Sequence, residues 1–258
     1  MCELFGISFN EPVRPNLSVK GFRKKGERNP DGWGIAYYPD ESAQVIKEPI
    51  EAGISFLSEF LRNYAEIVSK IFIIHVRKSS IGNATHKNTH PFTRELNGRE
   101  YVFAHNGSIK NFKSLDTGRF TPIGETDSEH VFCHLLNEIE TNQISDWTPN
   151  DFQWLNQKLK DINANGKFNC IFSDGEHLFC YHDENDFKDY CLLQRKGPYG
   201  EIKMKEDEFE FNLPQEKFSQ TGYFVATNPL TEDEWISFLP GELVVFKNGE
   251  IVYSDTEK

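Results

Sequence analysis

The sequence lacks any apolar run long enough to cross a membrane, because none of its stretches approaches ~18 consecutive apolar residues. Its N-terminus also lacks the basic segment and apolar stretch of a secretory signal. Basic residues are few: 28 Lys and Arg stand against 40 Asp and Glu, and the formal net charge is −12. A nucleic-acid surface needs clustered basic residues. These absences predict a soluble, cytoplasmic globular protein whose partners include neither nucleic acid nor a membrane.

Cysteine is also scarce, with five residues, an odd number, and no CxxC spacing. This pattern disfavours a disulfide framework and a cysteine zinc site. The 18 glycines, 12 prolines and 26% charged residues rule out collagen, a coiled coil and wholesale disorder. A chain of 258 residues is one large domain or two small ones, and it is long enough to bury a core without a structural metal.

Strands are expected near both ends of the chain and in its middle, from short apolar or alternating segments bounded by turn residues. The expected strands cover 2–9, 34–38, 44–47, 71–77, 101–105, 168–173, 177–182, 244–247 and 250–253. The pair Asn248-Gly249 is a strong hairpin signal. The pair Asn106-Gly107 is typical of a turn and is expected to end the strand before it.

Three helices are expected between these groups of strands. One is predicted over 51–69 from five apolar residues at helical spacing, Ile54, Leu57, Leu61, Tyr64 and Val68. Thr126 with Glu129 forms a capping-box pattern that opens a second, and Thr148-Pro149 opens a third. Residues 10–32 and 78–98 are expected to be loops, and 183–217 an acidic, irregular surface excursion. Strands, then helices, then strands without alternation predict an α+β fold with antiparallel sheets.

Cys2 is the first candidate for chemistry. If the initiator Met1 is removed, Cys2 carries both a thiol and a free α-amine. An α-amine has a reference pKa of about 7.7–8.0, which suits a general base at neutral pH. An N-terminal amine is a recognised activator of its own nucleophile. Taken alone, however, a cysteine at position two has no functional meaning.

Three further sites have both a functional and a structural interpretation. Arg77, at the end of a buried strand, suits a carboxylate but also a structural ion pair. Asn106 and Gly107 suit an oxyanion hole, in which a side-chain amide and a backbone N–H converge, but also a plain turn. Asp127 suits a substrate ammonium, although a carboxylate in the first turn of a helix also favours the helix dipole.

Histidines at positions 75, 86, 90 and 105 crowd a short part of the chain. Zinc sites use several histidines, but no H-E-x-x-H or comparable spacing is present. The metal interpretation is weak, and neither a metal nor a cofactor is predicted.

Together these residues form an ordered set of motifs that resembles the class II glutamine amidotransferases, the group with an N-terminal cysteine nucleophile. The resemblance runs from residue 2 to about residue 252 and rests on Cys2-Glu-Leu-Phe-Gly-Ile, Asp31-Gly-Trp-Gly34, His75-Val-Arg77 with Ser80 and Gly82, Asn88-Thr-His90-Pro-Phe92, His105-Asn-Gly-Ser-Ile109, Thr126-Asp-Ser-Glu129, Ala226-Thr-Asn-Pro-Leu-Thr-Glu-Asp-Glu-Trp235 and Leu239-Pro-Gly-Glu-Leu-Val-Val245. The last two motifs resemble the compact, stand-alone members.

The resemblance implies a single domain over 2–258 with the N-terminal-nucleophile hydrolase fold, a four-layer αββα sandwich with two antiparallel sheets. It also implies a role for each matching residue. Cys2 is the nucleophile, and Asn106 with Gly107 forms the oxyanion hole. Arg77 holds the α-carboxylate and Asp127 the α-ammonium of glutamine. Ser80 and His90 line the same pocket.

The implied reaction is hydrolysis of the γ-carboxamide of glutamine through a γ-glutamyl thioester on Cys2, which releases ammonia. Larger members continue into a synthase domain, so an acceptor of the ammonia is expected on a separate chain. Two alternatives stay open. The run Lys78-Ser79-Ser80-Ile81 departs from the larger members, which favours a γ-glutamyl amide other than glutamine. The chain could also be a non-catalytic γ-glutamyl-binding subunit.

Overall fold

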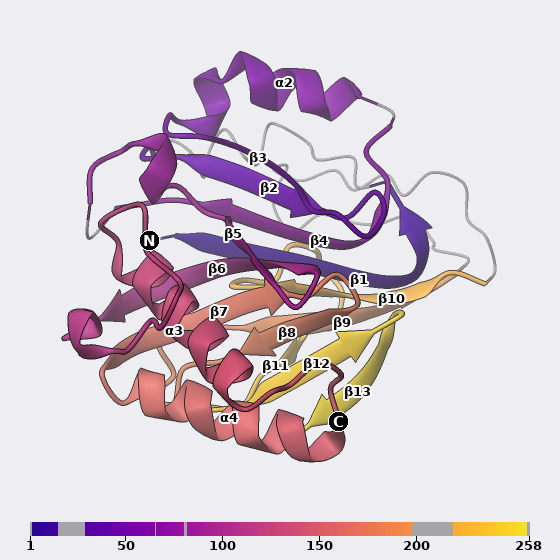
Figure 1. Cartoon of the computed structure of the whole chain (residues 1–258). Helices are drawn as coiled ribbons and strands as arrows, with labels where there is room; N and C mark the ends of the chain where they lie inside the picture. The colour runs from indigo at the N-terminus through magenta and orange to yellow at the C-terminus, as the bar shows by residue number, and fades with distance from the viewer. Residues whose placement is uncertain (1, 15–28, 65, 80–81, 198–218, 257–258) are drawn as a thin grey trace.

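The computed structural model describes residues 2–14, 29–64, 66–79, 82–197 and 219–256, which form two antiparallel sheets packed face to face (Figure 1). The seven-stranded sheet contains, in spatial order, β11 (Ile236–Ser237), β9 (Cys191–Lys196), β10 (Thr221–Ala226), β1 (Glu3–Val13), β4 (Ser69–Val76), β2 (Trp33–Tyr37) and β3 (Gln44–Glu48). The six-stranded sheet contains β13 (Glu250–Ser254), β12 (Leu243–Lys247), β8 (His177–Tyr181), β7 (Gly166–Ser173), β6 (Arg99–Ile109) and β5 (Phe92–Leu96).

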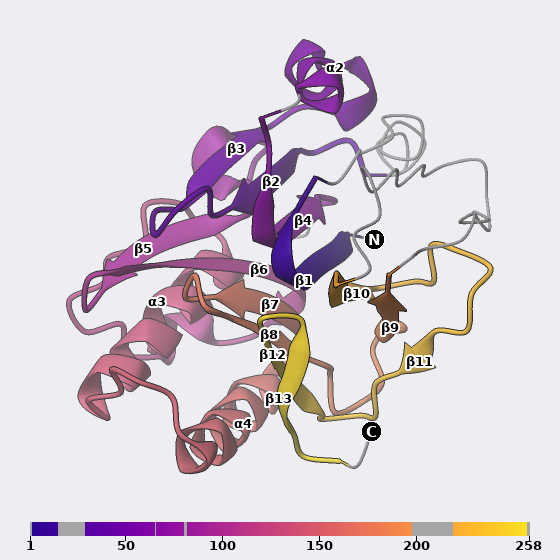
Figure 2. The ribbon, with the colours of Figure 1, turned by 90° about the vertical axis from the view of Figure 1, so that its right-hand side faces the viewer.

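Helices cover the two outer faces, as Figures 1 and 2 show. The helices of the described residues are the α-helices α2 (Phe56–Asn63), α3 (Asp127–Thr141) and α4 (Pro149–Asn163), and the short 3₁₀ turns η1 (Ala52–Ile54), η2 (His86–Asn88) and η3 (Phe112–Ser114). Helices α3 and α4 pack on the six-stranded sheet, and α2 packs on the seven-stranded sheet. This arrangement confirms the α+β class and the two antiparallel sheets. None of these helices has the length and hydropathy needed to cross a bilayer.

The strands bury side chains on both faces, because each sheet has a helical layer on one side and the other sheet on the other. Along β6, Val102 and Ala104 join the core between the sheets, whereas Tyr101 and Phe103 join the core on the side of the helices. This alternation follows the two-residue period of a strand. The continuous apolar runs in the sequence are therefore explained by burial on both faces.

Gly6 on β1 marks the close approach of the two sheets. A Cβ atom at this position would lie 2.2 Å from Cδ1 of Ile171 on β7, well inside contact distance. The glycine therefore leaves room for the fully buried Ile171. This contact brings the start of β1 close to the six-stranded sheet.

Local sequence signals are confirmed where a turn or cap acts on its own neighbours. The Thr148 side chain accepts a hydrogen bond from Asp151 N, and the Asp151 carboxylate accepts one from Thr148 N, so α4 starts with a complete capping box. Asn248 and Gly249 take φ values of 49° and 74° between β12 and β13. Because both residues have positive φ, they form the tight hairpin turn that the sequence predicts.

The helix predicted over 51–69 is too long. The structure has η1, then α2 starting after the N-cap Ser55, and β4 begins at Ser69. Ile54, Tyr64 and Val68 were expected on the buried face but are 68%, 43% and 43% exposed. Leu57 and Leu61 alone of the five spaced positions pack against the core.

The strand expected to stop at Asn106-Gly107 continues through them to Ile109, because β7 pairs with it over this whole length. A Cβ atom at Gly107 would lie 1.9 Å from the carbonyl oxygen of Lys167, so the glycine serves close strand pairing rather than a turn.

Other boundaries also differ. The expected loop over 78–98 contains β5, which forms a hairpin with β6 through Asn97 and Gly98 at positive φ. The expected surface excursion over 183–217 contains β9, and β1 extends into the loop expected from residue 10. Pairing with distant strands decides the structure of β9 and of the end of β1, whereas β5 pairs with the strand that follows it.

We predict that Ile171→Ala lowers the free energy of unfolding by about 3 kcal/mol, because it leaves a cavity between the sheets. Urea denaturation measures the loss. Ile123→Ala, at a side chain 69% exposed, is the matched control and should change stability by less than about 0.5 kcal/mol. Equal losses in the two variants would contradict the placement of Ile171 in the intersheet core.

Candidate active site

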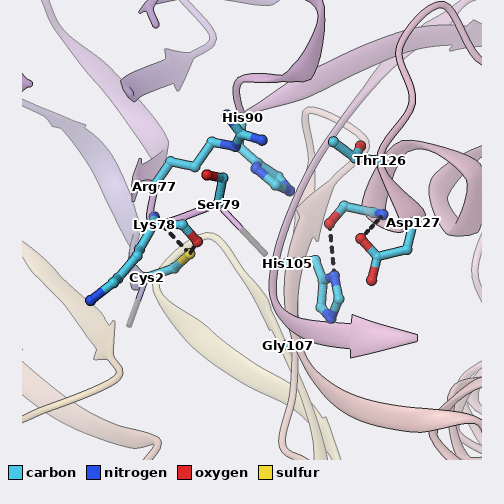
Figure 3. A pocket seen from close by; sticks show the side chains of 10 residues that line it. Cys2, Arg77, Lys78, Ser79, His90, His105, Gly107, Thr126 and Asp127 are labelled. Atoms are coloured by element: carbon cyan, nitrogen blue, oxygen red, sulfur yellow. Dashed lines mark hydrogen bonds between the residues drawn. The ribbon is translucent and has the colours of Figure 1, made fainter. Parts of the chain in front are cut away.

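A pocket opens where the start of β1, the end of β4, the end of β6 and the start of α3 meet (Figure 3). Antiparallel pairing of Glu3 with Val76 brings the residue before β1 next to the residue after β4. The lining residues are Cys2, Arg77, Lys78, Ser79, His90, His105, Gly107, Thr126, Asp127 and Ser128. The topology thus gathers at one point residues that are up to 126 positions apart in the chain.

The thiol of Cys2 is held by the backbone of Lys78. Lys78 N donates to Sγ at 3.1 Å, and the thiol donates to the carbonyl oxygen of Lys78 at 3.2 Å. Burial raises the pKa of the thiol, whereas the Lys78 N–H and the charges of Lys188 and Arg77 oppose that rise. The nucleophile candidate therefore lies in a fixed position beside donors and cations that favour its thiolate.

The carbonyl oxygen of Cys2 accepts two further hydrogen bonds. Asn106 Nδ2 and Lys188 Nζ each donate to it at 2.7 Å. Asn106 is buried beside the pocket and uses one of its two amide hydrogens in this bond, which leaves the second for another acceptor. Lys188 follows β8, in a segment expected to be surface, and no sequence signal pointed to it.

Arg77 lines the pocket and is buried. Its guanidinium donates to the carbonyl oxygens of Asp31 at 3.4 Å, Gly82 at 3.1 Å and Asn83 at 3.2 Å. The carboxylate of Asp31 in turn accepts from the N–H and the hydroxyl of Ser79, at 2.7 and 2.9 Å. Asp31 therefore ties the segment after β4 to the segment before β2, which is a structural role for the Asp31-Gly-Trp-Gly34 motif.

Asp127 is buried at the first position of α3 and lines the same pocket. Its carboxylate accepts from Ile109 N at 2.7 Å and from Ser128 N at 3.0 Å. These bonds anchor the end of β6 to the start of α3, so the helix-terminus interpretation holds. A carboxylate can accept about four hydrogen bonds, so the same group retains capacity for a substrate ammonium.

His90 contributes a neutral imidazole to the pocket wall. Its ring packs against that of His75 at a tilt of 37°, with 4.2 Å between the centroids, and both side chains are buried. Burial lowers the pKa of His75 to about 3 and that of His90 well below the ordinary value. Among the described residues, no group of three or more His, Cys, Asp or Glu is placed to hold a metal ion.

The segment that carries His90 is fixed against β2 and β3. Lys47 Nζ donates to the carbonyl oxygens of Thr89 at 2.6 Å and Pro91 at 3.0 Å. A Cβ atom at Gly34 would lie 2.2 Å from the carbonyl oxygen of His90. A glycine at this position therefore allows the segment to cross β2 closely.

His105 holds the wall of the pocket below Gly107. Its Nδ1 lies 2.9 Å from Ser128 Oγ and its Nε2 lies 3.1 Å from the carbonyl oxygen of Lys167. Burial lowers the pKa of this imidazole as well. The contacts link β6, β7 and α3 at the bottom of the site.

The structure thus brings most of the sequence candidates to one pocket. Its wall includes Cys2, Arg77, His90, Gly107 and Asp127, with Asn106 directly beside it. Ser80 lies outside the described residues. Sequence reasoning missed Ser79, Thr126, Ser128 and Lys188, and it gave Asp31 no role although the residue stands in a quoted motif.

Comparison with known proteins places these features in one family. The model for class II glutamine amidotransferases matches residues 1–258. MJ1515, an uncharacterized protein of Methanocaldococcus jannaschii, is 47% identical over 99% of this chain and 72% of its own length. YafJ of Escherichia coli K12 is 34% identical over 98% of this chain and 100% of its own length.

Solved structures agree. The crystal structure titled as a predicted glutamine amidotransferase from Pseudomonas aeruginosa superposes with a TM-score of 0.74 at 30% identity, covering 98% of this chain and 100% of that one. The glutamine phosphoribosylpyrophosphate amidotransferase of B. subtilis has a TM-score of 0.67 at 18% identity, covering 98% of this chain and 49% of that one. The second likeness concerns the fold alone.

We predict that the buried histidine pair makes the protein sensitive to acid. Above pH 6.5 both imidazoles are neutral in the folded and in the unfolded protein, so the pair does not change the free energy of unfolding. Below pH 6.5 the imidazoles of the unfolded chain bind protons, whereas burial keeps them neutral in the folded protein, down to about pH 3 for His75. Each histidine then removes about 1.4 kcal/mol of stability per pH unit. Urea unfolding between pH 7 and pH 5 measures this slope.

His75→Phe should lose about 1.4 kcal/mol less per pH unit below pH 6.5 than the unchanged protein. His86→Gln, at an exposed position, is the matched control and should keep the original slope. Parallel curves for His75→Phe and the unchanged protein would contradict the neutral buried pair.

Proposed function

Because the chain belongs to the class II glutamine amidotransferases, we propose that it hydrolyses the γ-carboxamide of glutamine with Cys2 as its N-terminal nucleophile. The observation that carries the proposal is one pocket in which the Cys2 thiol, the Arg77 cation and the Asp127 anion all form part of the wall. A free amino acid requires one cation for its carboxylate and one anion for its ammonium. The chain supplies both beside a thiol.

The reaction begins when the α-amine of Cys2, exposed by removal of Met1, takes the thiol proton. The thiolate attacks the γ-carbonyl carbon of glutamine, and the C–N bond breaks after the tetrahedral intermediate forms. The proton held by the amine passes to the departing ammonia. Water then cleaves the γ-glutamyl thioester, releases glutamate and restores the thiol.

Asn106 and Gly107 stabilise the oxyanion of this intermediate in the proposed mechanism. Asn106 Nδ2 is already fixed by its 2.7 Å bond to the Cys2 carbonyl, which is support for preorganisation next to the nucleophile. His90 forms a neutral part of the wall, and Ser80 keeps the substrate-binding role that its motif implies. No metal or cofactor takes part in the proposed mechanism.

The ammonia acceptor is proposed to lie on a separate chain. The support is the resemblance to the compact, stand-alone members of the family, together with the match to YafJ over 100% of that protein's own length. We also propose that residues 2–258 act as one domain, since both sheets contribute to the same pocket.

We predict that a diazo-ketone analogue of glutamine forms one adduct at Cys2. Intact mass and peptide mapping, on protein with a free native N-terminus, should show loss of Met1 and a single added mass. Cys2→Ala should take up no adduct, whereas Cys133→Ala, at a buried thiol, is the control and should label fully. Loss of Met1 without an adduct would instead favour another γ-glutamyl amide, and retained Met1 would favour the non-catalytic subunit.

We predict that Asn106→Ala lowers glutaminase turnover by about 10²–10³-fold, the usual cost of one lost oxyanion donor. Release of ammonia from glutamine measures the effect, and thermal melting checks that the fold is retained. Asn150→Ala, at an exposed position of α4, is the control and should leave turnover unchanged. Unchanged turnover in Asn106→Ala would remove this residue from the mechanism.

A further inference from the structure

Lys188 is a buried cation that the proposed mechanism does not use. Its side chain is only 8% exposed, its Nζ donates to the Cys2 carbonyl oxygen at 2.7 Å, and it forms an ion pair with Glu3 at 3.0 Å. A buried lysine is costly unless it is paired. The ion pair with Glu3 offsets this cost and holds the charge beside Cys2.

The loop before Lys188 is fixed by buried polar groups of the six-stranded sheet. Asp183 accepts hydrogen bonds from Phe168 N at 2.7 Å and Asn185 N at 2.8 Å. Asn169 Nδ2 donates to the carbonyl oxygen of Phe187, the residue next to Lys188. The backbone next to Lys188 is therefore fixed, and its ammonium does not move freely as that of a surface lysine does.

The counter-ion is fixed as well. Glu3 accepts from Thr227 Oγ1 at 2.6 Å and from Asn228 Nδ2 at 3.1 Å, in addition to its ion pair with Lys188. These two residues belong to the Ala226-Thr-Asn-Pro motif, which the proposed mechanism leaves without a role. The motif therefore orients the carboxylate that orients the lysine.

The distance from Lys188 to the reacting amine follows from bond geometry. The carbonyl oxygen and the nitrogen of one residue are at most about 3.6 Å apart, so Nζ lies within about 6 Å of the Cys2 nitrogen. A cation at that distance favours the neutral form of an amine and the anionic form of a thiol. Lys188 does not line the pocket, so a bound substrate leaves this effect in place.

Charged or titratable groups face Cys2 from every surrounding element, and they are Glu3, Arg77, Lys78, His90, His105, Asp127 and Lys188. Lys78 is exposed to solvent, and burial lowers the pKa of His90 and His105. Arg77 is the proposed partner of the substrate carboxylate, which offsets its charge. Among the residues that the structure describes, Lys188 is thus the buried cation that acts on Cys2 in both the free and the bound state.

We propose that Lys188 is a positioning residue that fixes the Cys2 carbonyl and, by its charge, sets the pH at which the Cys2 amine and thiol become active. This inference rests on the proposed role of Cys2 as an N-terminal nucleophile. It adds an electrostatic control that lies outside the pocket and is built from Lys188, Glu3, Thr227 and Asn228.

The test is the pH dependence of Cys2 alkylation by iodoacetamide, which needs no substrate. The protein is produced behind a cleavable leader whose removal leaves Cys2 as the first residue, and peptide mapping quantifies the modified thiol. In Lys188→Met the midpoint of the alkylation rate should rise by about one pH unit, because the cation is lost. Lys188→Arg should restore it, and Lys70→Met, an exposed lysine at the opposite end of β4, should leave it unchanged.

Glu3→Gln tests the opposite direction, because it removes the counter-charge of Lys188, and its midpoint should fall. If Lys188→Met does not fold, Glu3→Gln by itself tests the inference. The inference would be overturned by an unchanged midpoint in Lys188→Met, and equally by an unchanged or raised midpoint in Glu3→Gln. The reason is that the loss of a purely structural role changes the alkylation rate by the same factor at every pH. Absent glutamine turnover alongside the expected shifts would overturn the proposed function alone.

Discussion

The position of Cys2 depends on hydrogen bonds that converge on its carbonyl oxygen, from Asn106 on one side and Lys188 on the other. Both donors belong to the six-stranded sheet or its loops, whereas Cys2 directly precedes β1 of the other sheet. Chain ends ordinarily fray. Here the end is fixed because β1 is paired along both edges and because Gly6 lets the two sheets approach closely. The packing of the sheets is thus the constraint on which the site depends.

Much of the fold could be predicted from the sequence, and two of the failures share a physical cause. The α4 capping box and the Asn248-Gly249 hairpin act through neighbouring residues, so local patterns were enough. The end of β6 could not be found in this way, because Asn106-Gly107 has the local preference of a turn and is held in a strand by pairing with β7. The strand β9 lies in a polar segment for the same reason: its partners are distant in sequence.

The site was less predictable than the fold in its supporting residues. Motif resemblance pointed to candidate side chains that the structure places in or beside one pocket, since each lies in a short ordered pattern. It did not reveal that the backbone of Lys78 holds the thiol, because a backbone group leaves no residue signature. Nor did it reveal Lys188, whose contact with Cys2 spans 186 positions and whose neighbours are acidic and irregular. Asp31 stood in a motif, but only the structure gives it a partner in Ser79.

The pairing of β1 also bears on how the molecule folds. Phe5 pairs with Ala226, so β1 is completed by a strand that lies 221 positions later in the chain. Such non-local pairing is slow, because a long loop must close before any contact compensates for its entropy. Asn106 and Lys188, which hold the Cys2 carbonyl oxygen, are also distant in the chain. The geometry around Cys2 is therefore a property of the finished fold, and a partly folded chain does not contain it.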